Sequence, residues 1–515
     1  MSNGAATRAA RITFAAAVAA ILLAAVLVRS WGALIAPLDF WADEAWWATL
    51  LETRGLGELG FRPVGYLWLC RQLNDLGPPE AMLRLPSWFA GVGAVVLLWR
   101  GATLSYSSRA AVLFVLLLAA FHPKLVVFAK EFKPYSVETF VFAGLTCWAL
   151  ACLRRGCASR GLVAAALAAL PFCYPVVFLY PALLLAFAGE RLAALRRLST
   201  FQGIFAGLAL AALLLFAHMR LFELLEAAQS RWFWGAKYGV FPLGEGLAGT
   251  IAWYAGKTWS LLALPGALDS VPSSLRSWFA VAWLGGLGAL VAEKRWREIA
   301  LLATPLAAVA LANALGYWPY GAFRANLFLV PAGLLVGGHA VDWLASRARL
   351  RSASWALAAL VLAAVVAVDP RKYASKSIAH WAPSPQLTVV LDDIERRRLA
   401  DAGRWNDVIL ADWHSWRPIA YYMRAYPALS VGTRLVRGPI SDLPALEAML
   451  AAELDAGRSG PLPVRLWLVV TRLESHGAIR SSRAVSLYGV YRREYSTRDR
   501  DYHPVLIELR SPRAN

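Results

Sequence analysis

Residues 12–36 read ITFAAAVAAILLAAVLVRSWGALIA, and residues 37–47, directly after them, read PLDFWADEAWW. The first stretch is long and apolar enough to cross a bilayer as a helix, for which about 20 residues are needed. Arg29 and Trp31 stand at its end, where a cleaved signal peptide would have small residues. We therefore expect an uncleaved first span that delivers an acidic segment to the membrane surface.

Apolar runs of similar length recur along the first three quarters of the chain. The hydrophobic content is 59%, against roughly 45–50% in soluble domains, and the mean hydropathy is +0.50. The clearest further runs are residues 110–128, 201–219, 299–315 and 355–368. The pattern predicts a polytopic α-helical membrane protein with about 11 transmembrane helices.

The charge pattern predicts how these spans are oriented. The net charge is +19, but the basic residues gather in every second short loop, so they indicate topology and not nucleic-acid binding. The basic loops contain Arg8 and Arg11, Arg100 and Arg109, Arg154 and Arg155, Arg191, Arg196 and Arg197, Lys294 and Arg295, and Arg347 and Arg349. Loops of this kind are cytoplasmic. We expect a multi-pass membrane protein with a cytoplasmic N-terminus.

The same pattern divides the chain into two domains. Residues 1–369 are expected to form the transmembrane domain, with outer loops at 37–85 and 220–276. Residues 370–515 are expected to form a soluble α/β domain outside the cytoplasm, because strand-like runs alternate with helical stretches there. The strand-like runs are residues 407–411, 464–470 and 504–509, and the helical ones include 387–400 and 443–456.

Three carboxylates, Asp39, Asp43 and Glu44, follow the first span within six residues. Charges near the apolar phase cost free energy, so a cluster of them suggests a function. They could act as a general base or bind a divalent metal in an outer cavity. The alternative is that they are solvated acids at the start of a helix.

A second polar cluster lies in FHPKLVVFAKEFKPYSVETF, residues 121–140. Its candidate site residues are His122, Lys130, Glu131, Lys133 and Tyr135. Lysines on the outer side run against the positive-inside pattern, which suggests an anionic partner; pairing with nearby acids is the structural alternative.

Arg324 lies in GYWPYGAFRANLFLVP, residues 316–331, after an outer turn that contains glycine and proline. Arginine that extends to the membrane surface is the structural alternative here. Together the clusters suit the deprotonation of a hydroxyl and the neutralisation of a phosphate leaving group, which is the chemistry of glycosyl transfer from a lipid phosphate.

At these residues the chain resembles the polytopic glycosyltransferases of the GT-C class, in the protein-mannosyltransferase-like and ArnT-like bacterial branch, which belongs to the glycosyltransferase family 39-like proteins. The resembling segments are, in order, DEAWW (43–47), FRPVGYLWL (61–69), EAMLRLPSWFAGV (80–92), FAKEFKPYSVETF (128–140) and YWPYGAFRANLFLVP (317–331).

The resemblance implies a polyprenyl-phosphate-linked sugar as donor and an extracytoplasmic acceptor, which would be a lipid, a polysaccharide or a protein. It implies catalytic roles for Asp43, as the base, and Glu44. Lys130, Lys133, Tyr135 and Arg324 are the candidate ligands of the donor phosphate, because the leaving phosphate gains charge and needs cations beside it. Many relatives have His or Ala before a Pro-Pro or Pro-Leu pair where this chain has Arg62, Pro63 and Val64, so the acceptor stays open.

Two other classes of function remain open from the sequence. A transporter or flippase of lipid-linked sugars should carry ionisable residues near the middle of several spans, whereas here the acids cluster outside. A non-catalytic scaffold would have no need of acids and cations on the same face. No cofactor is indicated, although Asp39, Asp43 and Glu44 leave a divalent metal open.

The topology gives a first testable prediction. A reporter that is active only in the cytoplasm, fused after Asn515, should give no signal, because the basic loops place residues 370–515 outside. The same reporter fused in the basic loop after Arg155 should be active and serves as the control. A strong signal from the C-terminal fusion would contradict the topology.

Overall fold

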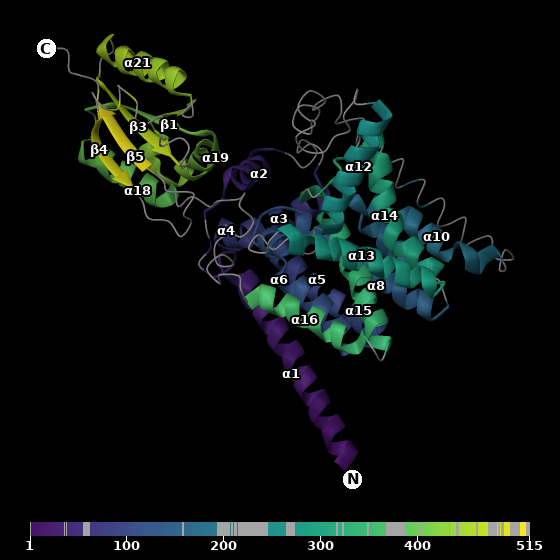
Figure 1. Ribbon diagram of the computed structural model, residues 1–515. Coiled ribbons are helices and arrows are strands. Elements are labelled where there is room, and N and C mark those ends of the chain that lie inside the picture. Colours follow the sequence, from purple (N-terminus) through teal and green to yellow (C-terminus); the bar gives the residue numbers. More distant parts are fainter. Residues whose placement is uncertain are drawn as a thin grey trace. The chain divides into compact units, whose positions relative to one another are not determined.

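The computed structural model describes most of the chain as two compact units (Figure 1). The described residues are 2–35, 39–54, 62–156, 159–192, 246–263, 273–315, 318–321, 324–347, 350–366, 387–401, 404–431, 433–438, 442–459, 462–471, 489–494 and 505–510, with a few isolated positions between them. The first unit comprises Met1–Ile35 and Gly55–Ala374, and the second comprises Ala36–Arg54 and Ser375–Asn515. Each unit is described by itself.

The first unit is helical. Its longer helices are α1 (Ser2–Ser30), α5 (Leu85–Ser105), α6 (Arg109–Phe121), α8 (Tyr135–Arg154), α10 (Leu179–Leu192), α12 (Gly246–Ala263), α13 (Ser273–Ala292), α14 (Trp296–Ala314), α15 (Val330–Ser346) and α16 (Arg351–Val366). Its shorter elements are α3 (Val64–Asn74), α4 (Pro79–Met82), α7 (Pro123–Phe128), α9 (Arg160–Ala168) and the 3-10 helices η2 (Tyr174–Phe178) and η5 (Arg324–Leu329).

Among the described residues, five helical stretches are long and apolar enough to cross a membrane. They are Arg11–Ser30, Pro79–Ser105, Tyr135–Arg154, Trp296–Ala314 and Arg324–Ser346. Four shorter apolar helices accompany them, at Arg109–Phe121, Tyr174–Phe187, Trp278–Ala292 and Ser352–Ala363. The prediction of a polytopic α-helical membrane protein is thereby confirmed. The expected span at residues 201–219 and most of the expected loop at 220–276 lie outside the described residues, apart from α12 and the start of α13.

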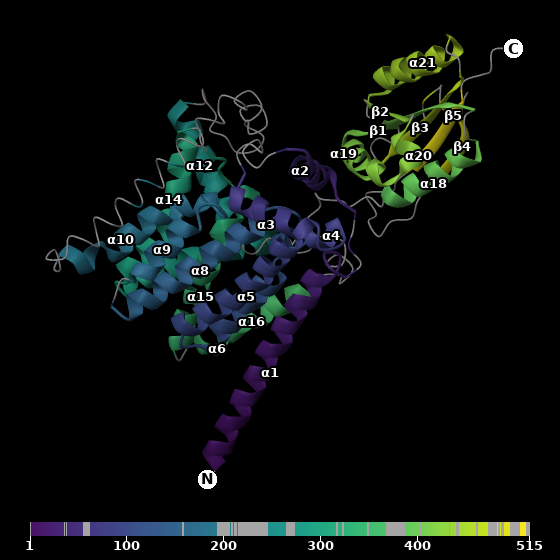
Figure 2. The same cartoon turned by 180° about the vertical axis from the view of Figure 1, so that it is seen from behind.

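Small residues allow these helices to pack closely. α5 packs on α8 (Figure 2), and α13 packs on α15 (Figure 1). A Cβ at Gly101 would lie 2.3 Å from Cys147 Sγ, and one at Gly286 would lie 1.9 Å from the Val336 carbonyl oxygen. Larger side chains at these two positions would force the helices apart, as expected where packing holds helices together in lipid.

The expected apolar run at residues 110–128 is broken into α6 and α7. His122 has a non-helical backbone (φ −59°, ψ 119°), and Pro123 opens α7. Proline has no N–H and restricts the residue before it, so α6 ends at Phe121. The His122 Nδ1 accepts a hydrogen bond from the Leu125 N–H at 3.3 Å, which caps α7.

Arg29, the unusual cation of the first span, is fully buried against the end of α6. Its guanidinium donates to the Ala120 carbonyl at 2.6 Å and to the Ala119 carbonyl at 2.9 Å. Both carbonyls belong to the last turn of α6, where a cation complements the helix dipole. Arg29 therefore joins α1 to α6.

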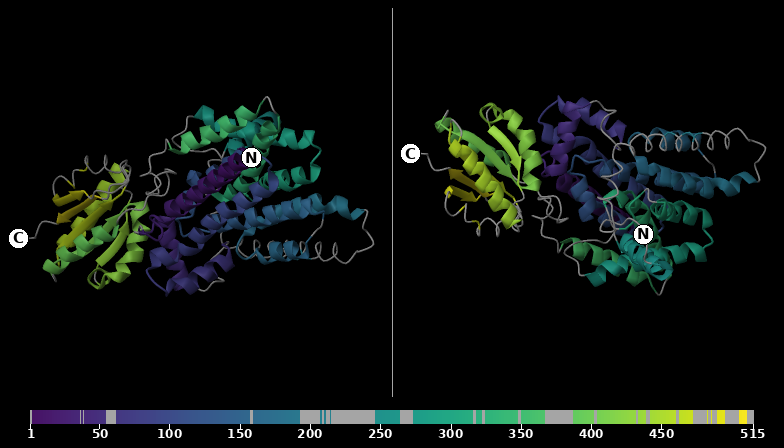
Figure 3. Two further views of the ribbon diagram at one scale, coloured as in Figure 1. Left: turned by 90° about the horizontal axis from the view of Figure 1, so that it is seen from below. Right: turned by 90° about the horizontal axis from the view of Figure 1, so that it is seen from above.

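The second unit is a five-stranded mixed sheet with helices on both faces (Figures 1 and 3). The strands are β1 (Asn406–Ala411), β2 (Thr433–Arg437), β3 (Val464–Val470), β4 (Gly489–Glu494) and β5 (Val505–Arg510), in the order β2-β1-β3-β5-β4. β1 is parallel to β2 and β3, while β5 is antiparallel to β3 and β4. The helices are α2 (Ala42–Thr53), α18 (Leu387–Ala400), α19 (Trp413–Tyr422), α20 (Pro427–Ser430), α21 (Leu443–Ser459) and the 3-10 helix η8 (Met423–Ala425).

The two faces of this sheet differ in character. On one face, Leu446 and Leu450 of α21 pack on alternate residues of β1, β3 and β5 in an apolar core. On the other face, Asp407 and Arg465 form a buried ion pair, with Arg465 Nε donating to Asp407 Oδ1 at 2.7 Å. Successive side chains of a strand point to opposite faces of the sheet, so the apolar residues lie on one face and Asp407 and Arg465 lie on the other.

The course of the chain differs from the expected division at one place. Residues 36–54, expected within an outer loop of the transmembrane domain, belong to the second unit. The physical reason is a set of polar contacts. Asp39 accepts a hydrogen bond from the Thr388 N–H of α18 at 2.9 Å, and the Phe40 N–H donates to the Tyr422 hydroxyl at 2.7 Å.

The buried ion pair gives a second prediction. Asp407→Asn removes the buried carboxylate that accepts from Arg465 at 2.7 and 3.2 Å. Arg465, which is 1% exposed, keeps only Asp401, 29% exposed, as counter-charge at 3.1 Å, so the change should cost about 2 kcal/mol or more. Limited proteolysis of the full-length protein during a thermal ramp should show earlier cleavage within residues 387–510. The matched control is Glu453→Gln, which removes the partner of Arg434, a side chain that is 59% exposed. That change should cost about 1 kcal/mol or less, and equal shifts in both variants would refute the prediction.

Candidate active site

The predicted site residues fall in both units. His122, Lys130, Glu131, Lys133, Tyr135, Arg324 and Arg62 belong to the helical unit, and Asp39, Asp43 and Glu44 belong to the unit that contains the sheet. The two groups are therefore described separately.

Lys130, Glu131 and Lys133 lie in the turn between α7 and α8 and are almost completely buried, with exposed fractions of 0%, 0% and 3%. The turn is held by a chain of hydroxyls. The Ser87 hydroxyl donates to the Lys133 carbonyl at 2.7 Å, and the Tyr66 hydroxyl lies 3.1 Å from Ser87 Oγ. The backbone that carries both lysines is thus fixed by α3 and α5.

Arg324 lies next to this turn. It opens η5, which packs on α7 and α8, and its guanidinium carbon lies 5.8 Å from the centre of the Tyr135 ring. Tyr135 in turn packs edge-on against Phe128, at 5.0 Å between ring centres. Two of the predicted phosphate ligands, far apart in the sequence, therefore lie side by side in the helical unit.

The backbone before Arg324 is shaped by Asn326, which is fully buried. Its amide donates to the carbonyls of Pro319 and Gly321, at 3.0 and 2.9 Å, and its Oδ1 accepts from Trp318 Nε1 at 2.9 Å. Gly321 has a φ of +124°, which favours glycine. The Gly and Pro of this turn suggested the site from the sequence, whereas the role of Asn326 was missed.

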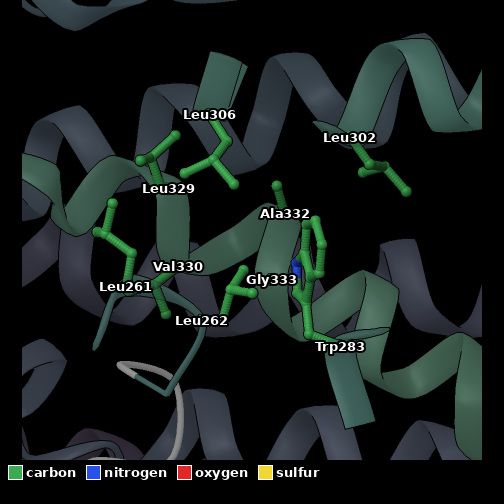
Figure 4. A pocket seen from close by; sticks show the side chains of 9 residues that line it. All are labelled: Leu261, Leu262, Trp283, Leu302, Leu306, Leu329, Val330, Ala332 and Gly333. Carbon is green, nitrogen blue, oxygen red and sulfur yellow. The ribbon is translucent and has the colours of Figure 1, made fainter. Parts of the chain in front are cut away.

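An apolar pocket begins where η5 ends (Figure 4). Its empty space is about 390 Å³, including the part that is open to the surroundings. Its lining comes from α12, α13, α14, η5 and α15, and consists of Leu261, Leu262, Trp283, Leu302, Leu306, Leu329, Val330, Ala332 and Gly333. A 3-10 helix rises about 2 Å per residue, so Arg324 and Leu329 are separated by roughly 10 Å along η5.

His122 and Arg62 take part in local structure. His122 is 1% exposed and caps α7, as described above. The Arg62 carbonyl accepts a hydrogen bond from the Tyr174 hydroxyl at 2.7 Å. These contacts show how the backbone is held at both positions.

The three acids of the second unit are in different environments. Asp39 accepts from the Thr388 N–H at 2.9 Å and from the Thr388 hydroxyl, whose single proton faces both carboxylate oxygens, at 3.0 and 3.2 Å. Glu44 is fully buried in the first turn of α2, and its Oε2 accepts from the Trp41 N–H at 3.4 Å. Asp43 is 26% exposed. Asp39 is also partly exposed, but both of its carboxylate oxygens accept from Thr388.

Arg417 of α19 is a residue that the sequence analysis missed. Its Nη1 lies 3.9 Å from Asp43 Oδ1, and its guanidinium carbon lies 4.4 Å from the centre of the Trp46 ring. Burial lowers the pKa of the Arg417 guanidinium from its ordinary value, while Asp43 opposes that shift by favouring the charged form. Nothing in the local sequence RPIAYY indicated this contact, because 374 residues of chain separate the two partners.

A metal site is not formed by the described residues as they stand. They contain no group of three or more histidine, cysteine, aspartate or glutamate side chains that could hold a metal ion. Asp39 and Glu44 are engaged with Thr388 and the backbone of Trp41 instead.

Comparison with known proteins gives distant structural similarity. No protein-family model matches the chain, and no curated protein matches it either. The structure of ArnT from Cupriavidus metallidurans in the apo state is 12% identical over 98% of this chain and 98% of that chain, with a TM-score of 0.49. The same protein bound to undecaprenyl phosphate is 13% identical over 96% and 97%, with a TM-score of 0.37.

A second kind of protein is also similar. The archaeal oligosaccharyltransferase AglB from Archaeoglobus fulgidus, in complex with an inhibitory peptide and a dolichol-phosphate, is 11% identical over 93% of this chain and 73% of that chain, with a TM-score of 0.44. ArnT gives its name to the branch that the sequence motifs resemble.

The surroundings of Arg324 give a third prediction. Its planar fork can hold two phosphate oxygens, whereas lysine is a point charge, so Arg324→Lys should not behave as a conservative change. We expect binding of polyprenyl phosphate to the purified protein to weaken by about tenfold or more in Arg324→Lys and Arg324→Ala. Lys133→Ala should weaken it less.

The control for this prediction is Arg100→Lys, which changes another arginine of the helical unit, one whose guanidinium carbon lies 5.8 Å from the centre of the Trp99 ring. It should bind like wild type. Unchanged affinity in both Arg324 variants would mean that this arginine only extends to the membrane surface.

Proposed function

We propose that this protein is a membrane glycosyltransferase that moves a sugar from a polyprenyl-phosphate donor to an acceptor outside the cytoplasm. The proposal is supported by the ordered motifs of the GT-C class and by the distinct chemical environments of the residues those motifs contain. The observation that carries it is the contrast among the three acids. Asp43 is 26% exposed and lies 3.9 Å from Arg417. Glu44 is fully buried, and both carboxylate oxygens of Asp39 accept from Thr388.

In the proposed reaction Asp43 is the general base. It takes the proton of the acceptor hydroxyl as the acceptor oxygen attacks the anomeric carbon of the donor sugar. A new bond forms between that oxygen and that carbon, and the bond between the carbon and the phosphate oxygen breaks. The polyprenyl phosphate leaves with the electron pair, and Asp43 later gives the proton to water.

The cations of the helical unit take the role of charge stabilisation in this proposal. The leaving phosphate gains negative charge as the bond breaks, and preorganised donors are most effective where charge develops. Lys130, Lys133 and Arg324 are positively charged, and Tyr135 lies beside Arg324 to orient it. The apolar pocket at the end of η5 is a suitable place for the first isoprene units of the lipid.

The roles of the neighbouring acids follow from their contacts. Asp39 is assigned to anchoring the segment through Thr388, and Glu44 to fixing the first turn of α2 through the Trp41 N–H. Neither role requires a metal. The proposal includes the sequence-based topology, with Asp43 and the cations on the outer side of the membrane.

The fourth prediction tests the base. Asp43→Asn keeps the shape of the side chain but cannot accept the proton, so transfer from a polyprenyl-phosphate sugar should fall by about 100-fold or more. Glu44→Gln should lower turnover less, because an amide oxygen can still accept from the Trp41 N–H. Initial rates with purified full-length protein, at equal amounts of folded protein, give the measurement.

The matched control is Glu52→Gln, which removes a second acid of α2 that pairs with Arg424 and should leave the rate near wild type. Near wild-type turnover in Asp43→Asn would remove Asp43 as the base. Equal losses in Asp43→Asn and Glu44→Gln would point to a metal that both carboxylates bind.

A further inference from the structure

Arg417 faces two residues of the same motif. Asp43 and Trp46 are three positions apart in α2 and therefore lie on one side of that helix. The Arg417 guanidinium is 3.9 Å from the Asp43 carboxylate and 4.4 Å from the centre of the Trp46 ring. One side chain of α19 thus contacts both the acid and the first tryptophan of DEAWW.

The helix that carries Arg417 is itself firmly placed. α19 begins after Asp412, which is 5% exposed and accepts hydrogen bonds from the Ser415 N–H at 2.8 Å and the Ser415 hydroxyl at 2.6 Å. The other Asp412 oxygen accepts from the Thr471 N–H at 2.8 Å, at the end of β3. α19 is therefore tied to two neighbouring strands of the sheet, and Arg417 extends from a rigid support.

The end of α19 is also fixed to the acidic segment. The Tyr422 hydroxyl accepts from the Phe40 N–H at 2.7 Å, and the Tyr421 ring lies 5.4 Å from the Phe40 ring in an edge-on contact. α2 and α19 pack against each other along their lengths. The helix that carries Asp43 is therefore supported on one side by residues that follow position 400 in the chain.

We propose that Arg417 is a positioning residue for the catalytic base, so that the sheet-containing unit is part of the catalytic machinery through its hold on Asp43. This inference rests on the proposed function of Asp43. The Arg417 guanidinium, stacked on Trp46, fixes the orientation of the carboxylate and favours its ionised form. Trp46 supplies the flat surface that fixes the guanidinium.

Three physical features favour this role. Arginine stacks on aromatic faces and presents a rigid fork, so it loses little freedom when it orients a carboxylate. An opposite charge within about 4 Å favours the ionised carboxylate, which is the form that accepts a proton. A base that is displaced by about 1 Å can lose about 100-fold in rate, so a residue that orients it has a measurable effect without touching the substrate.

The same helices offer a matched control. Arg424, in η8 directly after α19, pairs with Glu52 near the end of α2, and its guanidinium carbon lies 5.8 Å from the centre of the Tyr421 ring. This is also an arginine that joins the C-terminal part of the unit to an acid of α2 and lies over an aromatic ring. It differs from Arg417 in that its acid is nine positions from Asp43.

The experiment compares Arg417→Gln, Arg417→Lys and Arg424→Gln in the purified full-length protein, with kcat and KM for a polyprenyl-phosphate sugar. For Arg417→Gln we expect kcat to fall by about 30-fold or more with KM for the donor changed by about threefold or less, because the base and not the donor site is disturbed. Arg417→Lys keeps the charge and should restore part of kcat. Arg424→Gln should stay within about twofold of wild type.

Several results would overturn the proposal. One is a kcat of Arg417→Gln near the wild-type value, and another is an equal fall in Arg417→Gln and Arg424→Gln, which would indicate only a general loss of packing. If Arg417→Gln does not yield folded protein, Arg417→Lys decides: a kcat equal to wild type rules the positioning role out, and a reduced kcat with unchanged KM supports it.

Failure of the proposed function is distinguishable in the same assay. If wild type transfers no sugar from any polyprenyl-phosphate donor to cell-envelope acceptors, the proposed function is wrong and the role of Arg417 falls with it. If wild type is active and Asp43→Asn is not, the base is established independently of the Arg417 variants. The inference is then judged on the Arg417 and Arg424 results alone.

Discussion

The contacts between the acidic segment Ala36–Arg54 and the C-terminal part of the chain are the constraint on which the second unit depends. Asp39 binds the start of α18, and Asp43 meets Arg417. Each carboxylate meets a group that comes more than 340 residues later in the chain. Because these contacts link distant segments, the sheet-containing unit incorporates the segment that carries the motif DEAWW. In the proposed function, the base therefore depends on the fold of residues 387–510.

Local patterns in the sequence were sufficient to predict most of the regular elements. The strand at Val464–Val470 and the helix at Leu387–Ala400 were predicted with the observed bounds, because both have a clear apolar periodicity. β2, with the sequence TRLVR, was missed, as charged residues at both ends conceal an edge strand. The break at His122 is an error of the opposite kind. Residues 110–128 were predicted as one apolar run of bilayer length, but Pro123 within this run ends the first helix.

The sequence predicted which kinds of residue form the candidate site, but it did not predict which other residues they contact. Carboxylates and cations near a membrane surface stand out in a sequence because of their cost there. Their contacts do not stand out, because Arg417 and Thr388 are ordinary surface-type residues in a polar region. The residues alone did not separate Asp39, Asp43 and Glu44, and only the resemblance singled out Asp43 as the base. The three-dimensional contacts distinguish them by partner, which is Thr388 for Asp39, the Trp41 N–H for Glu44 and Arg417 for Asp43.

Burial gives the two groups of charges different tasks. Lys130, Lys133 and Arg324 are each less than 10% exposed, so their desolvation is already complete in the folded protein. Electrostatic interactions are stronger where water is excluded, and donors held in place need no reorganisation when charge appears on a leaving group. A base has the opposite requirement, because it must reach the proton of an acceptor that arrives from solvent. The partial exposure of Asp43 meets that requirement, and a stacked arginine can orient such a carboxylate without enclosing it.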